Sequence, residues 1–213
     1  MIFSILQTKT GLFSADFDIR DQSGTPLGKI HLQGSIMTNT ANMNGIFQED
    51  MFSLRYGFKD RKSVDIPVVQ PYTILLNNTP CGAVFETHHK QGVLRSSAFH
   101  RLMIHSSEYD RFPIGFGEQG GKHPIYHGTR QIAQIEKGCV VHNGLHEYQV
   151  FSEDVQSGLI AVLFACYMHL QGAYHAGEKV TKSVSKRMSM TTDSWLLEKY
   201  NPDFTRRIQQ MDE

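Results

Sequence analysis

Ten consecutive apolar residues, Leu159–Met168, limit most strongly what this chain can fold into. A helix formed by this run is apolar on every side, so it must be buried in a protein core or in a bilayer. His169 and Gln171 close the run, which is well short of the roughly 18 residues that a membrane span needs. The length therefore favours a buried core helix over about 154–172 rather than a membrane anchor, and no transmembrane segment is expected.

The second constraint is an internal repeat in the part of the chain that precedes this helix. Thr25–Ile30 has the sequence TPLGKI and Thr79–Val84 the sequence TPCGAV, and each follows an apolar β-rich run and a turn. A weaker third copy is the run Arg130–Ile135, in which Ala133 takes the place of the glycine. Turn residues between two strand-like runs predict a β-hairpin, so the repeat predicts three hairpins about fifty residues apart.

The shared glycine predicts how these hairpins assemble. A glycine within a strand usually marks a bulge, a bend or a close approach of another group. Together with other short β-like runs, the hairpins give roughly a dozen strands, which is typical of sandwiches and barrels. We therefore expect a mainly β fold: a closed antiparallel barrel of about twelve strands around a buried hydrophobic C-terminal helix, followed by a short helical tail.

The length of 213 residues is consistent with one barrel domain, which we place at residues 1–177. Residues 178–213 form a polar linker and tail, with helical patterns over 194–200 and 202–211. Asn201 before Pro202 is a good N-cap signal, and Phe204, Ile208 and Met211 fall on one face. This last helix either packs back on the barrel or a neighbouring subunit, or recognises a partner.

Charge and cysteine content narrow the class of protein. Lys plus Arg and Asp plus Glu both total 21, and this balance argues against nucleic acid as a partner. The three cysteines, Cys81, Cys139 and Cys166, fit neither a disulfide framework nor a zinc knuckle. A cytoplasmic location is expected, either free or attached at the periphery of a membrane.

The repeated hairpins, the stretches Gln131–Lys137 and Tyr148–Phe151, and the apolar helix together resemble the tubby C-terminal-like superfamily over residues 1–175. That superfamily includes the tubby domain, the phospholipid scramblases and the LURP-one-related proteins, and in it the helix lies inside the barrel. The resemblance implies an association with membrane phospholipids, because tubby domains bind phosphoinositides through basic surface residues. Those positions do not match this chain, so no site residue is transferred. The palmitoylated cysteine cluster and the proline-rich N-terminal region of the scramblases are missing from this sequence, so their activity is not expected.

Eleven histidines raise the question of a metal or catalytic site. The pairs His123/His127 and His142/His146 are each four residues apart, but neither pair lies on a convincing helix, so no metal site is expected. The other histidines that fall near turns or strand ends are His88, His89, His100 and His105. We expect solvated or hydrogen-bonded histidines.

Other catalytic and cofactor signals are weak. The run Gly115–Lys122 lacks the last glycine of a dinucleotide-binding loop and the Ser/Thr of a phosphate loop, so we predict a long hairpin turn and no cofactor. There is no Gly-x-Ser-x-Gly motif, and no catalytic residue is assigned.

Two basic clusters are the candidate ligand-binding residues. They either form an ordinary solvated surface or make weak contacts to anionic lipid. The clusters consist of Lys59, Arg61 and Lys62, and of Lys179, Lys182, Lys186 and Arg187. Each basic residue near an anionic membrane contributes about 1 kcal/mol.

The leading hypothesis is a non-enzymatic binding or adaptor module that contacts anionic phospholipid or a protein partner. The alternatives are a small-molecule carrier with a pocket in the barrel and, less favoured, a histidine-based metal enzyme or hydrolase.

Overall fold

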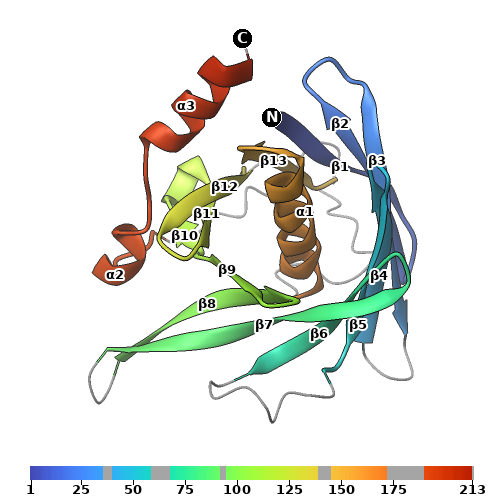
Figure 1. Cartoon of the computed structure of the whole chain (residues 1–213), viewed down its shortest axis with the longest axis horizontal. Helices are drawn as coiled ribbons and strands as arrows, with labels where there is room; N and C mark the ends of the chain where they lie inside the picture. Colours follow the sequence, from blue (N-terminus) through green and yellow to red (C-terminus); the bar gives the residue numbers. More distant parts are fainter. Residues whose placement is uncertain (36–39, 59–67, 92–94, 139–144, 172–189, 213) are drawn as a thin grey trace.

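The computed structural model describes residues 1–35, 40–58, 68–91, 95–138, 145–171 and 190–212. Its strands form one antiparallel sheet in the order β10-β11-β12-β13-β1-β2-β3-β4-β5-β6-β7-β8-β9, and a further pairing of β9 with β11 closes twelve of them into a barrel (Figure 1). The prediction of a mainly β fold with a closed antiparallel barrel of about twelve strands is thereby confirmed. The strands are β1 (Ile2–Thr10), β2 (Ser14–Asp21), β3 (Pro26–Ser35), β4 (Thr40–Phe47), β5 (Asp50–Tyr56), β6 (Val69–Leu76), β7 (Thr79–Gln91), β8 (Arg95–Ile104), β9 (Ser107–Arg111), β10 (Ile114–Gly115), β11 (Gly121–His127), β12 (Arg130–Lys137) and β13 (Glu147–Ser152).

The three repeated hairpins are β2–β3, β6–β7 and β11–β12, and all three carry a bulge at the predicted place. Leu27, Cys81 and Ile132 are the extra residues at which the pairing register shifts. Each directly precedes the residue in the glycine slot. The repeat therefore encodes a shared bend, which is one way in which a sheet curls towards closure.

The glycine is required in two copies because another strand lies against it. A Cβ atom on Gly28 would come within 2.0 Å of the Ile46 carbonyl oxygen, and one on Gly82 within 1.7 Å of the Met103 carbonyl oxygen. Only a residue without a Cβ permits these approaches.

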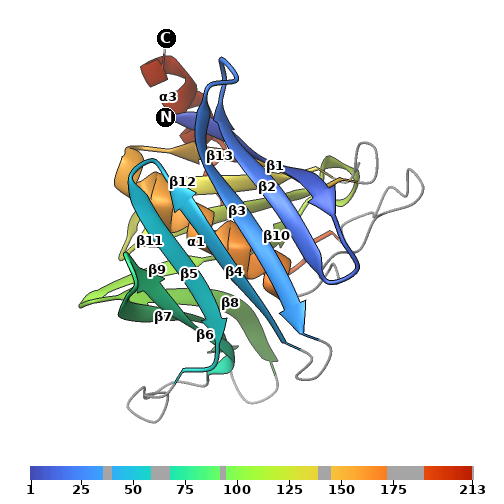
Figure 2. The ribbon, with the colours of Figure 1, turned by 90° about the vertical axis from the view of Figure 1, so that its right-hand side faces the viewer.

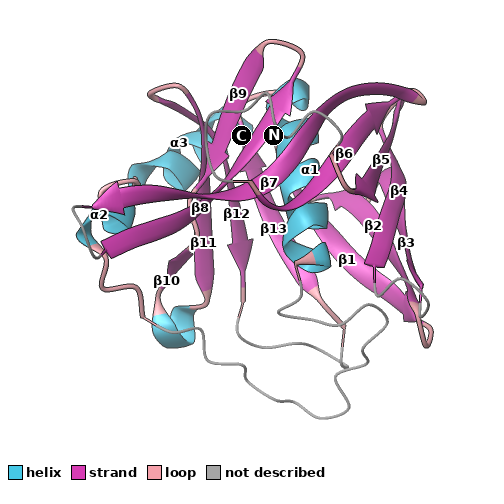
Figure 3. Ribbon diagram, turned by 90° about the horizontal axis from the view of Figure 1, so that it is seen from below, coloured by secondary structure: helices cyan, strands magenta, loops and turns pink. Residues whose placement is uncertain are grey.

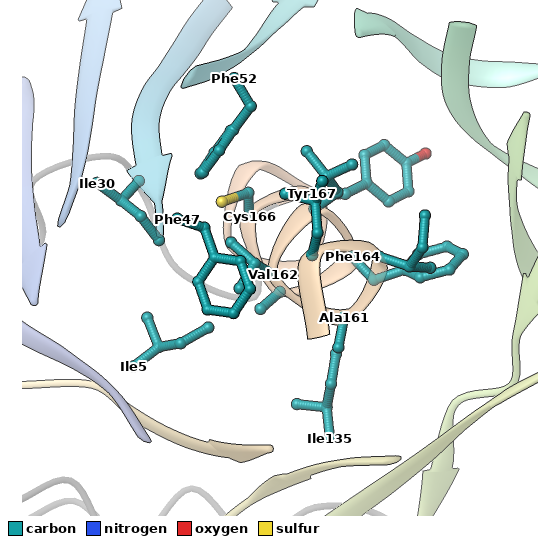
Figure 4. Close-up of a cluster of buried hydrophobic side chains, with 14 of the residues drawn as sticks. Ile5, Ile30, Phe47, Phe52, Ile135, Ala161, Val162, Phe164, Cys166 and Tyr167 are labelled. Atoms are coloured by element: carbon teal, nitrogen blue, oxygen red, sulfur yellow. The ribbon is translucent and has the colours of Figure 1, made fainter. Parts of the chain in front are cut away.

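Helix α1 (Val155–Leu170) is formed by the apolar run, and twelve of its sixteen residues are buried. Its side chains contact strands in several directions: Tyr167 packs against Tyr72 of β6 and His100 of β8, and His169 packs against Phe17 of β2. In Figure 1 strands are drawn on every side of α1, and Figure 4 shows apolar side chains of β1, β3, β4, β5 and β12 directed towards it. The prediction of a buried helix is confirmed.

The first turn of α1 is fixed by Asp154, whose Oδ1 accepts a hydrogen bond from the Ser157 backbone N–H at 2.7 Å. We expect Asp154→Ala to lower the free energy of unfolding by about 1 kcal/mol, because this N–H group then loses its partner. Thermal denaturation measures the loss as a shift in Tm of about 2–4 °C. Asp154→Asn keeps the acceptor and is expected to retain most of the stability; an equal loss in both variants would contradict the capping role.

The tail packs on the outside of the barrel, which confirms the prediction that its last helix packs back on the barrel. Helix α3 (Asp203–Asp212) buries Phe204 and Ile208 against Ile2 and Phe151, whereas Met211 is exposed, contrary to the prediction that it shares the buried face. The Asn201 cap is present, since its Oδ1 accepts the Asp203 backbone N–H. The predicted boundary at 177/178 lies outside the described residues.

The short helix α2 (Ser194–Leu197) lies beside the C-terminal end of β7 and the N-terminal end of β8 (Figure 3). Trp195 stacks on His89 of β7 and contacts Phe99 of β8 and Phe112, which follows β9. The Tyr126 hydroxyl of β11 donates to the Lys199 carbonyl. The segment 190–200 thus covers the outer face of the place where β9 and β11 close the barrel.

Candidate functional site

The basic clusters predicted from the sequence lie outside the described residues. This holds for Lys59, Arg61 and Lys62 and for Lys179, Lys182, Lys186 and Arg187. Their role in ligand binding therefore stays a prediction.

The predicted hairpin turn at Gly115–Lys122 is confirmed, because Gly115 pairs with Gly121 and Ile114 with Lys122 around one turn of 3-10 helix. Among the described residues, no three or more His, Cys, Asp or Glu side chains are placed to hold a metal ion. Likewise, no helix in the described part of the chain has the length and apolar character to cross a membrane.

A groove of about 690 Å³ lies on the outer face of β1–β5, the face turned towards the viewer in Figure 2. Its polar lining residues alternate along each strand with buried ones, so they point away from the barrel interior. The lining residues are Thr8, Lys9, Asp16, Phe17, Asp18, Lys29, Ile30, His31, Asn44, Gly45, Ile46, Met51, Phe52, Ser53, Arg55 and Asn78. A polar recess of about 300 Å³ adjoins the groove and shares Asn44 and Arg55 with it.

The two acidic side chains in the groove already have hydrogen-bond partners. Asp16 Oδ1 lies 2.6 Å from His31 Nδ1, and Asp18 Oδ2 lies 2.7 Å from Arg20 Nη2. By contrast, Lys9, Lys29 and Arg55 have no carboxylate within 4 Å among the described residues. Three lysine and arginine side chains are therefore available to an anionic ligand.

Apolar side chains stand next to one of these cations. Lys29, Ile46 and Met51 face each other across β3, β4 and β5 in direct register. Ile46 is 47% and Met51 46% exposed, so this adjacent pair places an apolar surface in the groove. The groove thus combines positive charge with an exposed apolar surface.

Sequence reasoning missed this groove because its residues come from five strands whose relative positions depend on barrel closure. A signal was present in the strands themselves: Ile46 and Met51 break the alternation of apolar inward and polar outward residues.

A second group of polar residues lies inside the barrel, near the C-terminal end of α1. The buried members are Gln7, His100, Arg111, His123, Lys137, His146 and His169. Arg111 Nη2 donates to His100 Nδ1 at 2.5 Å, and Arg111 Nη1 donates to His123 Nδ1 at 3.4 Å. No carboxylate forms an ion pair with Arg111 among the described residues, although Glu86 lies 3.6 Å from the far nitrogen of His100.

Burial sets the protonation of this interior group. Burial lowers the pKa of His100 to about 4, as does the positive charge of Arg111 to a smaller extent. Burial, then Arg111, also hold the pKa of His123 well below its usual range, and burial lowers the pKa of His169 to about 4. Burial lowers the pKa of Arg111 to about 9, which leaves it charged at neutral pH.

Comparison with known proteins adds nothing to this picture: no family model, curated protein or solved structure matches the chain. The kinship with the tubby-like proteins therefore stays a prediction.

Proposed function

We propose that this chain is a non-enzymatic binding module that holds an anionic phospholipid headgroup in the groove on the outer face of β1–β5. The observation that supports this proposal is the set of three cations without an ion-pair partner among the described residues, Lys9, Lys29 and Arg55, beside the exposed Ile46 and Met51. The volume of about 690 Å³ is in the range of small-molecule sites. A phosphate group would contact the cations, and the apolar pair would contact the glycerol and upper acyl region.

The expected strength of this contact follows from the charges. At about 1 kcal/mol per basic residue, the three cations contribute at most about 3 kcal/mol to membrane binding, or a factor of at most about 150 in the partition coefficient. The contribution is an upper limit because Asp16 and Asp18 lie opposite Lys9 and Lys29 in the strand register. Because the cations are exposed to solvent, salt screens the attraction, and binding is expected to weaken as ionic strength rises.

The small-molecule carrier is not proposed further, because the groove that supports binding lies on the outer face of the barrel, whereas α1 and the strands form a hydrophobic core cluster inside it. No arrangement among the described residues favours the metal enzyme.

Vesicle sedimentation tests the proposal. We expect the chain to bind vesicles of phosphatidylcholine with about 30 mol% phosphatidylserine at about 0.05 M salt, to bind less at about 0.15 M, and not to bind phosphatidylcholine alone. The double variant Lys29→Glu, Arg55→Glu loses two cations, so its partition coefficient is expected to fall by at least about 30-fold.

The matched control is Lys90→Glu, Arg206→Glu, which has the same net charge and changes exposed residues of β7 and α3 outside the groove. It is expected to bind within about threefold of the unmodified chain, since salt-screened charges far from the site contribute little. Equal losses in the two double variants, or no binding to anionic vesicles at either salt, would contradict the proposed site.

A further inference from the structure

The place where the barrel closes is its shortest strand pairing. In the described chain β9 and β11 are joined by three residue pairs, Tyr109 with His127, Asp110 with Tyr126, and Arg111 with Ile125. The neighbouring hairpin β7–β8 has ten such pairs. We call the β9–β11 contact the seam.

Arg111 occupies one end of this seam. It is the last residue of β9, and it is directly opposite His100 on β8 and Ile125 on β11. Its side chain points inward, where it hydrogen-bonds to His100 on one side and to His123 of β11 on the other. A single guanidinium therefore connects the three strands that meet at the seam, on the face opposite to the one covered by residues 190–200.

These hydrogen bonds require both imidazoles to be neutral. A guanidinium has only donors, so the Nδ1 atoms of His100 and His123 must each accept with a lone pair. The proton of each neutral ring is then on Nε2. The Nε2 atom of His100 faces Glu86, and the Nε2 atom of His123 has no hydrogen-bond partner in the described structure. Protonating either ring places an N–H group against an Arg111 N–H group and adds a second positive charge beside the guanidinium.

The surroundings give such a charge little compensation. Glu86 of β7 is the one carboxylate among the described residues that interacts with His100, and it is shared with His88 at 3.5 Å. From β12, Lys137 adds positive charge near His123. The other groups near Arg111 and His100 carry no charge at neutral or mildly acidic pH. They are Tyr167 and the Gln171 side chain at the end of α1, and Tyr148 of β13. A buried charge without a counter-ion costs several kcal/mol, so the contact becomes repulsive.

We propose that the β9–β11 seam is an acid-sensitive opening of the barrel, in which protonation of His100 and His123 breaks their hydrogen bonds to Arg111 and separates β9 from β11. The strand contact is short enough to give way before the rest of the sheet. Its opening exposes the part of the interior beside the C-terminal half of α1.

The direction of the pH dependence follows from the two protonation states. The pKa of both histidines is lower in the closed barrel than the usual value near 6.5, so the open form binds more protons. The closed seam is therefore fully favoured above about pH 6.5, and it loses stability as the pH falls from there towards about 4.

Hydrogen exchange followed by mass spectrometry at about pH 7.5 and about pH 5, corrected for the intrinsic pH dependence of exchange, tests the proposal. We expect the protection of amides in residues 107–111 and 121–127 to fall at least about tenfold at about pH 5, while amides in β2 and β3 keep theirs. The double variant His100→Gln, His123→Gln offers Arg111 amide oxygens that do not titrate, so it is expected to stay closed. The control His105→Gln changes an exposed histidine outside the groove and the seam and is expected to open like the unmodified chain.

Equal loss of protection in all strands would show global unfolding and overturn the local opening. Opening of the His100→Gln, His123→Gln variant at the same pH would overturn the role of the imidazoles. If that variant does not fold, nitrogen NMR of the imidazoles in the unmodified chain decides the question. Rings that stay neutral while the seam opens, or that become charged while it stays protected, exclude the mechanism.

Discussion

Phe164→Ala is expected to lower the free energy of unfolding by about 3–5 kcal/mol, the range for large-to-small substitutions at fully buried aromatic positions. Phe164 has no exposed surface, and it lies in the continuous core formed by α1 and the strands. Removing its ring leaves a cavity whose walls belong to a closed sheet. Because such a sheet cannot move inward without losing hydrogen bonds, the cavity is expected to collapse little.

Urea denaturation followed by circular dichroism measures this loss. Phe13→Ala removes the same ring from a position that is 37% exposed in the turn between β1 and β2, and we expect it to cost less than about 1 kcal/mol. A cost for Phe164→Ala that is no larger than the cost for Phe13→Ala would show that α1 does not support the barrel in solution.

Gly82→Ala is expected to lower the free energy of unfolding by about 3 kcal/mol, at the upper end for overpacked sites. The new methyl group would lie 1.7 Å from the Met103 carbonyl oxygen, a backbone atom held in the β7–β8 pairing, so neither group can rotate away. The bulge at Cys81 would have to be rebuilt, and with it the bend of the second hairpin. The same urea experiment measures the effect.

Gly11→Ala is the matched control. Its new methyl group would meet the Ser14 hydroxyl at 2.3 Å, but that side chain can rotate, so we expect a loss of less than about 1 kcal/mol. The third repeat already has a fully buried Ala133 in the corresponding slot. A loss for Gly82→Ala as small as the loss for Gly11→Ala would show that the slot tolerates a Cβ in the second repeat as well.

The features that could be predicted from sequence are those that depend on local spacing. A ten-residue apolar run is too short to span a membrane and is therefore expected to be buried in the core. The three repeats carry their bulges within a few residues of the turn. Both signals are complete within a short window, which explains why the helix and the bent hairpins were predicted correctly.

The features that could not be predicted depend on which segments meet. His169 was interpreted as the polar end of the apolar run, yet it is buried, where it contacts Phe17 and lies 3.1 Å from the Tyr148 hydroxyl. Arg111 has an ordinary sequence context, and its position becomes informative only when β8, β9 and β11 are adjacent. The groove likewise exists only after five strands are placed side by side.

The order of elements along the chain has a consequence for biosynthesis. All thirteen described strands precede α1, so they are synthesised before the residues that cover their apolar faces. Hairpins can form early, but a nascent chain that ends before Val155 lacks the centre of its core. Such chains expose apolar strands and are prone to aggregation. Completion of this barrel is therefore expected to be a late event, for which general chaperones would have to protect the unfinished sheet.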